Sequence, residues 1–414
     1  MERTANIPQA VWREDSAPFA RHQVSVRVFA SILIACACLS ALFASWLPLQ
    51  FSVVTLFLFA GPHNWFELRY FLMRMPVRFG RSRNFFVTAF VGIGVLTMAY
   101  LALPFLYNFR LWNDEAWSSI LASWNMLLVL WLGLLVWLRG RQKSARHRGN
   151  TNGDAALRRD WSWIIPVVPG LISLNWLAPE LFSLAIVYLH PLVALWFLDR
   201  HLRRTRPDWL RAYHRCLCLV PLLLLGIFWQ LGRTPALPDD NGLFWRITQH
   251  AGAQLLPNIS SHLLVSIHVF LEMLHYGVWL IALPLIAPSI SSGAETTLPP
   301  RGSGSGAVAR PSGRAWSPLQ NIARRVRADH ALPDGRATAP DCRGWRIWDL
   351  KAVGLARHPR GFPKIVGAVL AFGLFLVAML WFGFSVDYST TRDVYFTVAI
   401  AHVLAEAPFL LRML

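Results

Sequence analysis

Apolar runs long enough to cross a bilayer recur from residue 26 onward, and this feature limits the possible fold more than any other. Within hydrocarbon, a chain must satisfy its own backbone donors and acceptors, and a helix does so within a single segment. Hydrophobic residues make up 55% of the chain and charged residues 15%, against roughly 25% charged in soluble domains. The sequence therefore predicts an all-α fold, a polytopic transmembrane helical bundle.

We expect ten spans, which divide the chain into four parts. A cytoplasmic N-terminal tail (1–25) precedes spans one to eight (26–286). Residues 287–360 are expected to form a flexible cytoplasmic linker rich in Ser, Gly and Pro, in which "NIARRVRADHAL" has the composition of an amphipathic surface helix. Spans nine and ten occupy 361–414. The expected spans are 26–48, 50–75, 84–107, 119–138, 161–178, 180–199, 210–231, 259–286, 362–385 and 393–413.

The fifth of these spans contains Pro166, Pro169 and Gly170, and we expect a broken or re-entrant helix there. Such a segment is tolerated at membrane depth only against protein or water.

The basic residues predict the topology. The formal net charge is +18, from 40 Lys and Arg against 22 Asp and Glu. With ten spans and both termini cytoplasmic, 36 of the 40 basic residues face inward, as the positive-inside rule requires. We therefore expect a multi-pass protein of a bacterial-type cytoplasmic (inner) membrane. This distribution explains the charge without nucleic acid as a partner.

Four of the expected spans carry ionisable residues, which are costly in lipid and mark functional sites. All four are even-numbered, so they run in the same direction, from outside to inside. Span two carries His63 and Glu67; span six, His190; span eight, His262, His268, Glu272 and His275; span ten, His402 and Glu406.

Helical spacing relates these residues to one another. The His-x-x-x-Glu pairs of spans two and ten each share one face, and His268, Glu272 and His275 lie on one stripe of span eight. The Glu-x-x-His spacing at 272 and 275 is also that of di-iron carboxylate bundles. Counted from the outer end of each span, the groups fall in the middle to inner part of a core about 30 Å thick. We therefore expect the four helices to adjoin and bury one cluster. His262 lies off the stripe and nearer the outer surface, where an access role is expected.

This cluster predicts a metal site. Five His and three Glu, with no Cys in register, suit a hard or borderline ion, and non-haem iron, as one ion or two, is the first choice. Zinc and copper are alternative ions. Haem b held by two His is an alternative cofactor, but it leaves the repeated Glu unexplained. The predicted ligands are His63, Glu67, His190, His268, Glu272, His275, His402 and Glu406.

The predicted function is that of a membrane-bound, metal-dependent oxidoreductase. Site depth indicates a hydrophobic small-molecule substrate, such as a fatty acyl chain, carotenoid or quinone, which would be oxidised, desaturated or cleaved with the help of a redox partner. The His-x-x-His-His boxes of membrane desaturases are absent from the sequence. A haem-binding electron-transfer subunit, a zinc lipid hydrolase and a proton-coupled transporter with a His/Glu relay stay open. Membrane lipids are partners in every case.

Overall fold

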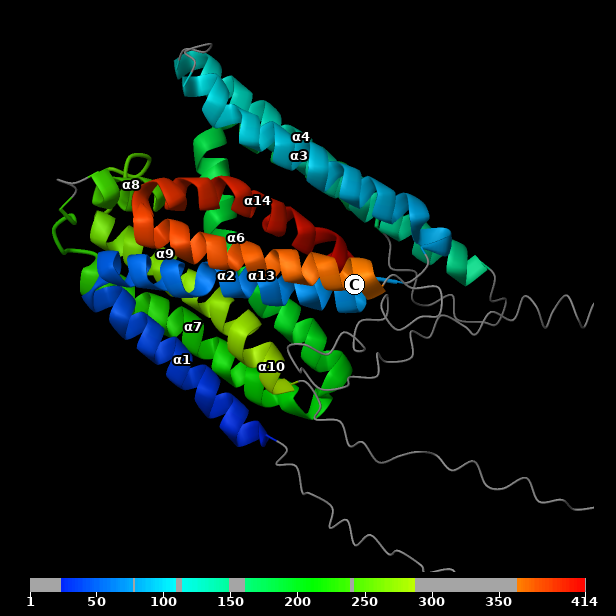
Figure 1. Ribbon diagram of the computed structural model, residues 1–414, viewed down its shortest axis with the longest axis horizontal. Helices are drawn as coiled ribbons and strands as arrows, with labels where there is room; N and C mark the ends of the chain where they lie inside the picture. The colour runs from blue at the N-terminus through cyan, green and yellow to red at the C-terminus, as the bar shows by residue number, and fades with distance from the viewer. Residues whose placement is uncertain are drawn as a thin grey trace, which may run out of the picture.

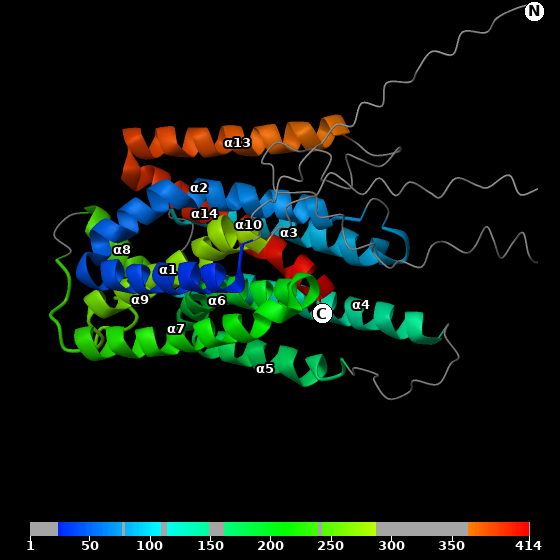
Figure 2. The same cartoon turned by 90° about the horizontal axis from the view of Figure 1, so that it is seen from below.

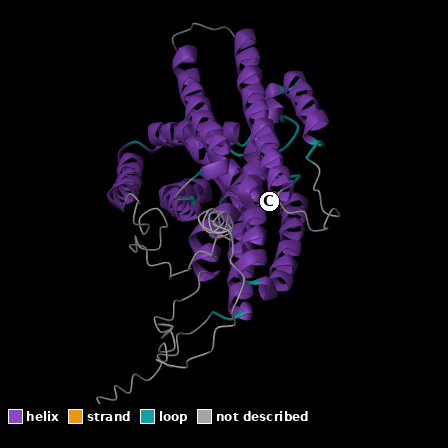
Figure 3. Cartoon of the chain, turned by 90° about the vertical axis from the view of Figure 1, so that its right-hand side faces the viewer, coloured by secondary structure: helices purple, strands orange, loops and turns teal. Residues whose placement is uncertain are grey.

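The computed structural model describes residues 24–76, 79–108, 114–148, 161–238, 242–286 and 363–413. All regular secondary structure in these ranges is helical (Figure 3), which confirms the all-α bundle. The linker over 287–360 and nearly all of the N-terminal tail lie outside the described residues, so the expectations for both stay predictions.

Long helices make up most of the described chain (Figure 1). In order they are α1 (Val26–Trp46), α2 (Pro48–Arg74), α3 (Arg83–Asn108), α4 (Asp114–Arg148), α5 (Ile164–Leu177), α6 (Pro179–Thr205), α7 (Leu210–Leu231), α8 (Gly242–His250), α9 (Ser261–Gly277), α10 (Leu283–Ile286), α13 (Pro363–Val386) and α14 (Tyr388–Met413). A π-helical turn over Val278–Ala282 joins α9 to α10, and short 3-10 turns precede α3 and α7.

Eight helical segments of the described chain are long and apolar enough to cross a membrane, with α9 and α10 counted as one. All ten expected spans are helical, but two fall short of this standard. Helix α5 has only 14 residues. It is continuous through Pro169, so the predicted break in this helix was wrong. Helix α2 has 27 residues, but polar side chains lower its mean hydropathy. By length and composition, eight of the ten expected spans therefore qualify as membrane spans.

Proline sets where two of the helices begin. Pro48 and Pro179 occupy the first positions of α2 and α6, where the missing N–H of proline would have no helical partner in any case. One non-helical residue precedes each proline, Leu47 in the first case and Ala178 in the second. Only one residue thus separates α1 from α2, and only one separates α5 from α6. Each pair must therefore lie side by side at the connection.

Helix α9 lies in the interior, against α1, α2, α6 and α7, whereas α13 and α5 lie at opposite edges in Figure 2. Small residues let α13 approach α2 closely. A Cβ added at Gly61 would lie 3.0 Å from Val377, and one at Gly373 would lie 3.2 Å from Trp65. The central position of α9 explains why its polar side chains are shielded from lipid.

Arginine contacts show that α2, α6 and α14 end on one face of the molecule, beside the C-terminal part of α4. Arg204 donates to the carbonyl of Met413, and Arg412 donates to the carbonyl of Arg74. Arg139 of α4 donates to the carbonyl of Arg412. Cationic side chains suit the negative end of the helix dipole. The even-numbered spans α2, α6 and α14 therefore run in the same direction, as predicted.

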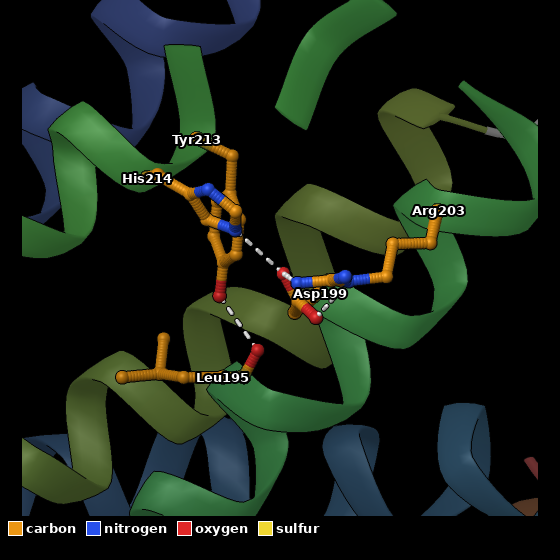
Figure 4. A network of polar contacts seen from close by, with 5 residues as sticks. All are labelled: Leu195, Asp199, Arg203, Tyr213 and His214. Atoms are coloured by element: carbon orange, nitrogen blue, oxygen red, sulfur yellow. Dashed lines mark hydrogen bonds and ion pairs between the residues drawn. The ribbon is translucent and has the colours of Figure 1, made fainter. Parts of the chain in front are cut away.

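A polar network ties α7 to this end of α6 (Figure 4). The Asp199 carboxylate accepts hydrogen bonds from Arg203 at 2.7 Å and from His214 at 2.7 Å. The Tyr213 hydroxyl donates to the carbonyl of Leu195 at 2.6 Å. Asp199 lies about two and a half helical turns beyond His190, so this network fixes the helix end rather than the predicted metal site.

Candidate metal centre

Helices α2, α6, α9 and α14 bring six of the eight predicted ligands together. Helix α9 packs against α2 and α6, and α14 contacts both of these. One ligand atom from each of His63, Glu67, His275 and His402 lies within 4.8 Å of the other three. His190, His275 and Glu406 form a second group within the same limit, so His275 belongs to both. We call these six residues the His/Glu cluster.

The imidazole rings of the cluster surround a small volume. Ring centroids are 5.3 Å apart for His63 and His275, 5.3 Å for His63 and His402, and 4.8 Å for His190 and His275. The Nδ1 atom of His190 lies 3.4 Å from Oε2 of Glu406. Ligand atoms about 2.1 Å from a tetrahedral ion are roughly 3.4 Å apart. Side-chain movements of about 1 Å would therefore close either group around an ion.

The cluster is short of hydrogen-bond partners. Within the described chain, neither carboxylate oxygen of Glu67 and neither ring nitrogen of His275 has one, and Nδ1 of His402 also has none. Glu67 is 1% exposed and His275 3% exposed, so water does not reach these atoms freely. An unsatisfied buried polar atom costs about 1–3 kcal/mol, and most are paired in native proteins. One cation could be shared by the Glu67 carboxylate and by one nitrogen from each of His275 and His402, because the two nitrogens of an imidazole point in different directions.

The backbone fixes the orientation of one ring. Nδ1 of His63 lies 2.9 Å from the carbonyl oxygen of Phe59, one turn earlier in α2. A carbonyl oxygen only accepts, so Nδ1 carries the proton and Nε2 carries the lone pair. Metal-binding imidazoles are held in this way through their second nitrogen. His63 is thus oriented as a ligand without help from a metal.

A cavity of about 230 Å³ adjoins the cluster, and its wall has two polar parts. The first consists of His63, His190, His275 and His402. The second consists of His250, His268 and Glu272. Its His268 lies about two turns, or 10 Å, from His275 along α9. The rest of the wall is mainly apolar or aromatic and includes Tyr100, Ile186, Val187, Pro191, Tyr276, Tyr395, Phe396, Ile400 and Val403.

The structure does not bring His268 and Glu272 into the His/Glu cluster. They pair with one another instead, with 3.4 Å between Nε2 of His268 and Oε1 of Glu272. Three residues turn a helix by about 300°, so Glu272 and His275 point about 60° apart and reach different parts of the cavity. His262, for which an access role was expected, lies 3.2 Å from the carbonyl of Ser45 through Nε2 and is not among the residues that line the cavity.

His250 is a cavity residue that sequence reasoning missed. It falls between two expected spans, where no helical periodicity could place its side chain. In the structure its ring lies 5.1 Å from that of His268. The Tyr188 hydroxyl holds the segment in place by donating to the carbonyl of Ala251 at 2.9 Å. Burial, reinforced by His268 and Arg392, lowers the pKa of His250 well below its ordinary value, so its ring is neutral.

A further buried contact lies on the other side of the His/Glu cluster. The Tyr70 hydroxyl is 2.9 Å from Nδ1 of His201, and Nη2 of Arg74 is 3.1 Å from the same nitrogen. A guanidinium only donates, so Nδ1 is the acceptor and Tyr70 donates to it. No local motif could have indicated His201, because it lies 131 residues from Tyr70 in the sequence.

The chain contains a transmembrane bundle with a buried His/Glu group able to hold a metal ion, and comparison with known proteins adds no further identification. No protein-family model matches it, and no curated protein or solved structure does so either.

Proposed function

We propose that this protein is an integral membrane metalloenzyme of a bacterial-type cytoplasmic membrane. Its His/Glu cluster would bind non-haem iron, and the adjoining cavity would hold a lipid-soluble substrate for oxidation, desaturation or cleavage. The observation that carries the proposal is the meeting of buried nitrogen and carboxylate atoms that have no hydrogen-bond partners among the described residues. A bound cation is the simplest group that could interact with one donor atom from each of these residues at once.

The donor set favours iron among the ions considered. Four imidazoles and two carboxylates, without thiolate, form the kind of nitrogen and oxygen set that non-haem iron enzymes use. Glu67 and Glu406 would neutralise the ion, which lowers the cost of burying charge in the bundle. His275 belongs to both ligand groups, so the cluster is compatible with one ion or two.

Haem b fits the cluster less well. A haem with two axial His would have to pass between two of these rings. The space around each pair is taken by the other His residues and by Glu67 and Glu406, which lie within the same groups. The carboxylates, which haem ligation leaves unexplained, are direct donors in a non-haem centre.

The cavity supports a lipid-soluble substrate. Its wall is largely aliphatic and aromatic, and it lies among helices that cross the hydrocarbon region. When bound, the iron would supply redox and oxygen chemistry, with electrons from a redox partner. The protein would orient the ion through His63 and Phe59, exclude water by burial, and hold the substrate beside the rings.

Elemental analysis with an optical spectrum tests the proposal directly. Protein purified in detergent should carry one or two iron ions per chain and show no Soret band. The variant His275→Ala should lose the iron, because His275 belongs to both ligand groups. His262→Ala is the matched control on the same helix, outside the cavity, and should keep it.

Other results would redirect the assignment. Full iron content in His275→Ala would overturn the assigned ligand set. A Soret band would favour a haem-binding electron-transfer subunit, and zinc alone would favour hydrolysis. Protein that binds no metal even after reconstitution would leave the His/Glu cluster as a proton relay in a transporter.

A further inference from the structure

The second polar part of the cavity presents one unused hydrogen-bond acceptor. The Glu272 carboxylate faces Nε2 of His268 at 3.4 Å, and an ionised carboxylate can only accept. Nε2 therefore carries a proton, and in the tautomer that this contact selects, Nδ1 has the lone pair. That nitrogen is buried and has no partner among the described residues, and His268 itself is 5% exposed. An acceptor in this position calls for a donor from a ligand.

A donor lies opposite this acceptor. The neutral ring of His250 has one N–H group, and its centroid is 5.1 Å from that of His268. A single oxygen atom on the cavity side of the two rings could accept from His250 and donate to His268. Tyr188 also lies against His268, with 5.7 Å between the rings, but its hydroxyl is used by the carbonyls of Ala251 and Leu264. His250 and His268 therefore supply the ring nitrogens of this part of the wall, and Nδ1 of His268 is buried without a partner among the described residues.

We propose that this part of the cavity binds the hydroxyl group of a lipid-soluble alcohol or phenol, with His268 as the acceptor and His250 as the donor. A hydroxyl group is the simplest ligand group that both donates and accepts at one atom. The apolar wall between the two polar parts would hold the hydrocarbon body of the ligand. Glu272 acts as a positioning residue, since it holds the proton of His268 on the far nitrogen.

The hydroxyl site names the substrate class of the proposed metalloenzyme. That the bound alcohol or phenol is then oxidised, desaturated or cleaved rests on the proposed function. The His/Glu cluster begins about 10 Å further along α9. The substrate would therefore be an elongated molecule whose reacting part lies about that far from its hydroxyl. Binding of the hydroxyl does not itself require the metal, so the two proposals can fail separately.

The test compares three radiolabelled probes of similar length on the detergent-purified full chain: 4-octylphenol, its methyl ether and a linear alkanol. The ether keeps the shape of the phenol but cannot donate a hydrogen bond. A buried hydrogen bond of this kind predicts that a hydroxyl probe binds at least tenfold more tightly than the ether. The phenol and alkanol arms show whether the site takes an aromatic or an aliphatic hydroxyl.

Variants locate the effect. His268→Phe keeps a ring but removes the acceptor, and should reduce the preference for the hydroxyl to about onefold. His268→Asn keeps an acceptor near the position of Nδ1 and should restore part of the preference. His262→Phe on the same helix should leave it unchanged. Iron content is measured on every sample and should be the same in the wild type and all three variants.

Equal binding of phenol, alkanol and ether by the wild type would overturn the inference, and this result does not depend on any variant folding. An unchanged hydroxyl preference in a folded His268→Phe protein would also overturn it. Hydroxyl preference in a protein that binds no metal would support the hydroxyl site and reject the proposed function. Iron binding without hydroxyl preference would support the metal centre and reject the hydroxyl site.

Discussion

Glu67 and Glu272 are both carboxylates inside the bundle, but they differ in what satisfies them. Glu272 has His268 at 3.4 Å, and its side chain is 12% exposed. Glu67 is 1% exposed, and in the part of the chain that the structure describes neither of its oxygens has a hydrogen-bond partner. A group that destabilises the metal-free fold in this way is expected at a binding site, where the ligand supplies the missing interaction.

The same substitution at the two positions should therefore have opposite effects on stability. Glu67→Met replaces an unsatisfied carboxyl group with an apolar side chain of similar length. It should raise the unfolding free energy of the metal-free protein by about 1–3 kcal/mol and abolish iron binding. Glu272→Met leaves His268 without its partner. It should lower the unfolding free energy by a similar amount and leave the iron content unchanged.

Thermal unfolding of metal-depleted protein in detergent, together with elemental analysis, measures both effects. If Glu67→Met destabilised the metal-free protein as much as Glu272→Met, the argument from unsatisfied atoms would be wrong.

Helical periodicity is enough to find the residues of the cluster but not their partners. His63 and Glu67 share a face because they are four residues apart, and they meet at the cluster in the structure. The three-residue spacing of Glu272 and His275 predicted a shared site, and this was wrong. The two side chains point about 60° apart, and Glu272 pairs with His268 instead. His250 and His201 depend on contacts between distant segments, and no local pattern indicates such contacts.

At the scale of the element, α2 shows how a functional helix can differ from an ordinary span. Its polar residues lower its mean hydropathy, yet its 27 residues run through the bundle between α13 and α9. Neighbouring helices shield these residues from lipid, so hydropathy alone understates how well α2 is accommodated. The span was predictable from its length and flanks, while its close approach to α13 depends on the positions of Gly61 and Gly373.

Two glycines of α3 provide a test of helix packing. A Cβ on Gly92 would overlap the indole of Trp131 on α4, whose Nε1 donates to the carbonyl of Thr88 at 3.1 Å. Gly92→Ala should therefore displace Trp131 and lower the unfolding free energy by about 1–3 kcal/mol. A Cβ on Gly94 would meet no described atom within 4 Å, so Gly94→Ala should leave the packing intact and raise the unfolding free energy by about 0.5–1 kcal/mol through helix propensity.

Thermal midpoints of the two variants in detergent give the comparison, and both should retain iron because α3 carries no ligand. Equal midpoints would mean that α4 adjusts to the added methyl group without loss.

At the scale of the whole molecule, the helix ends agree with the sidedness of the charges. Arginines from α2, α4, α6 and α14 meet at one face, where each contacts a carbonyl or polar group of another helix. The opposite face is poorer in basic residues. Two of its arginines, Arg246 and Arg392, both contact Asp393, which offsets part of their charge. The face with the arginine-rich helix ends is therefore the one expected in the cytoplasm.

Reporter fusions in a bacterial host can test this orientation. A fluorescent protein placed within 149–160 or after Leu414 should be bright, because both positions are expected in the cytoplasm. Alkaline phosphatase placed within 239–241 should be active, because the loop before α8 is expected outside. This orientation would put the His250 end of the cavity toward the outer leaflet and Tyr70, His201 and Arg74 toward the cytoplasm. Active phosphatase at 149–160 would reverse the topology, and a redox partner would then have to reach the metal from the side of α8.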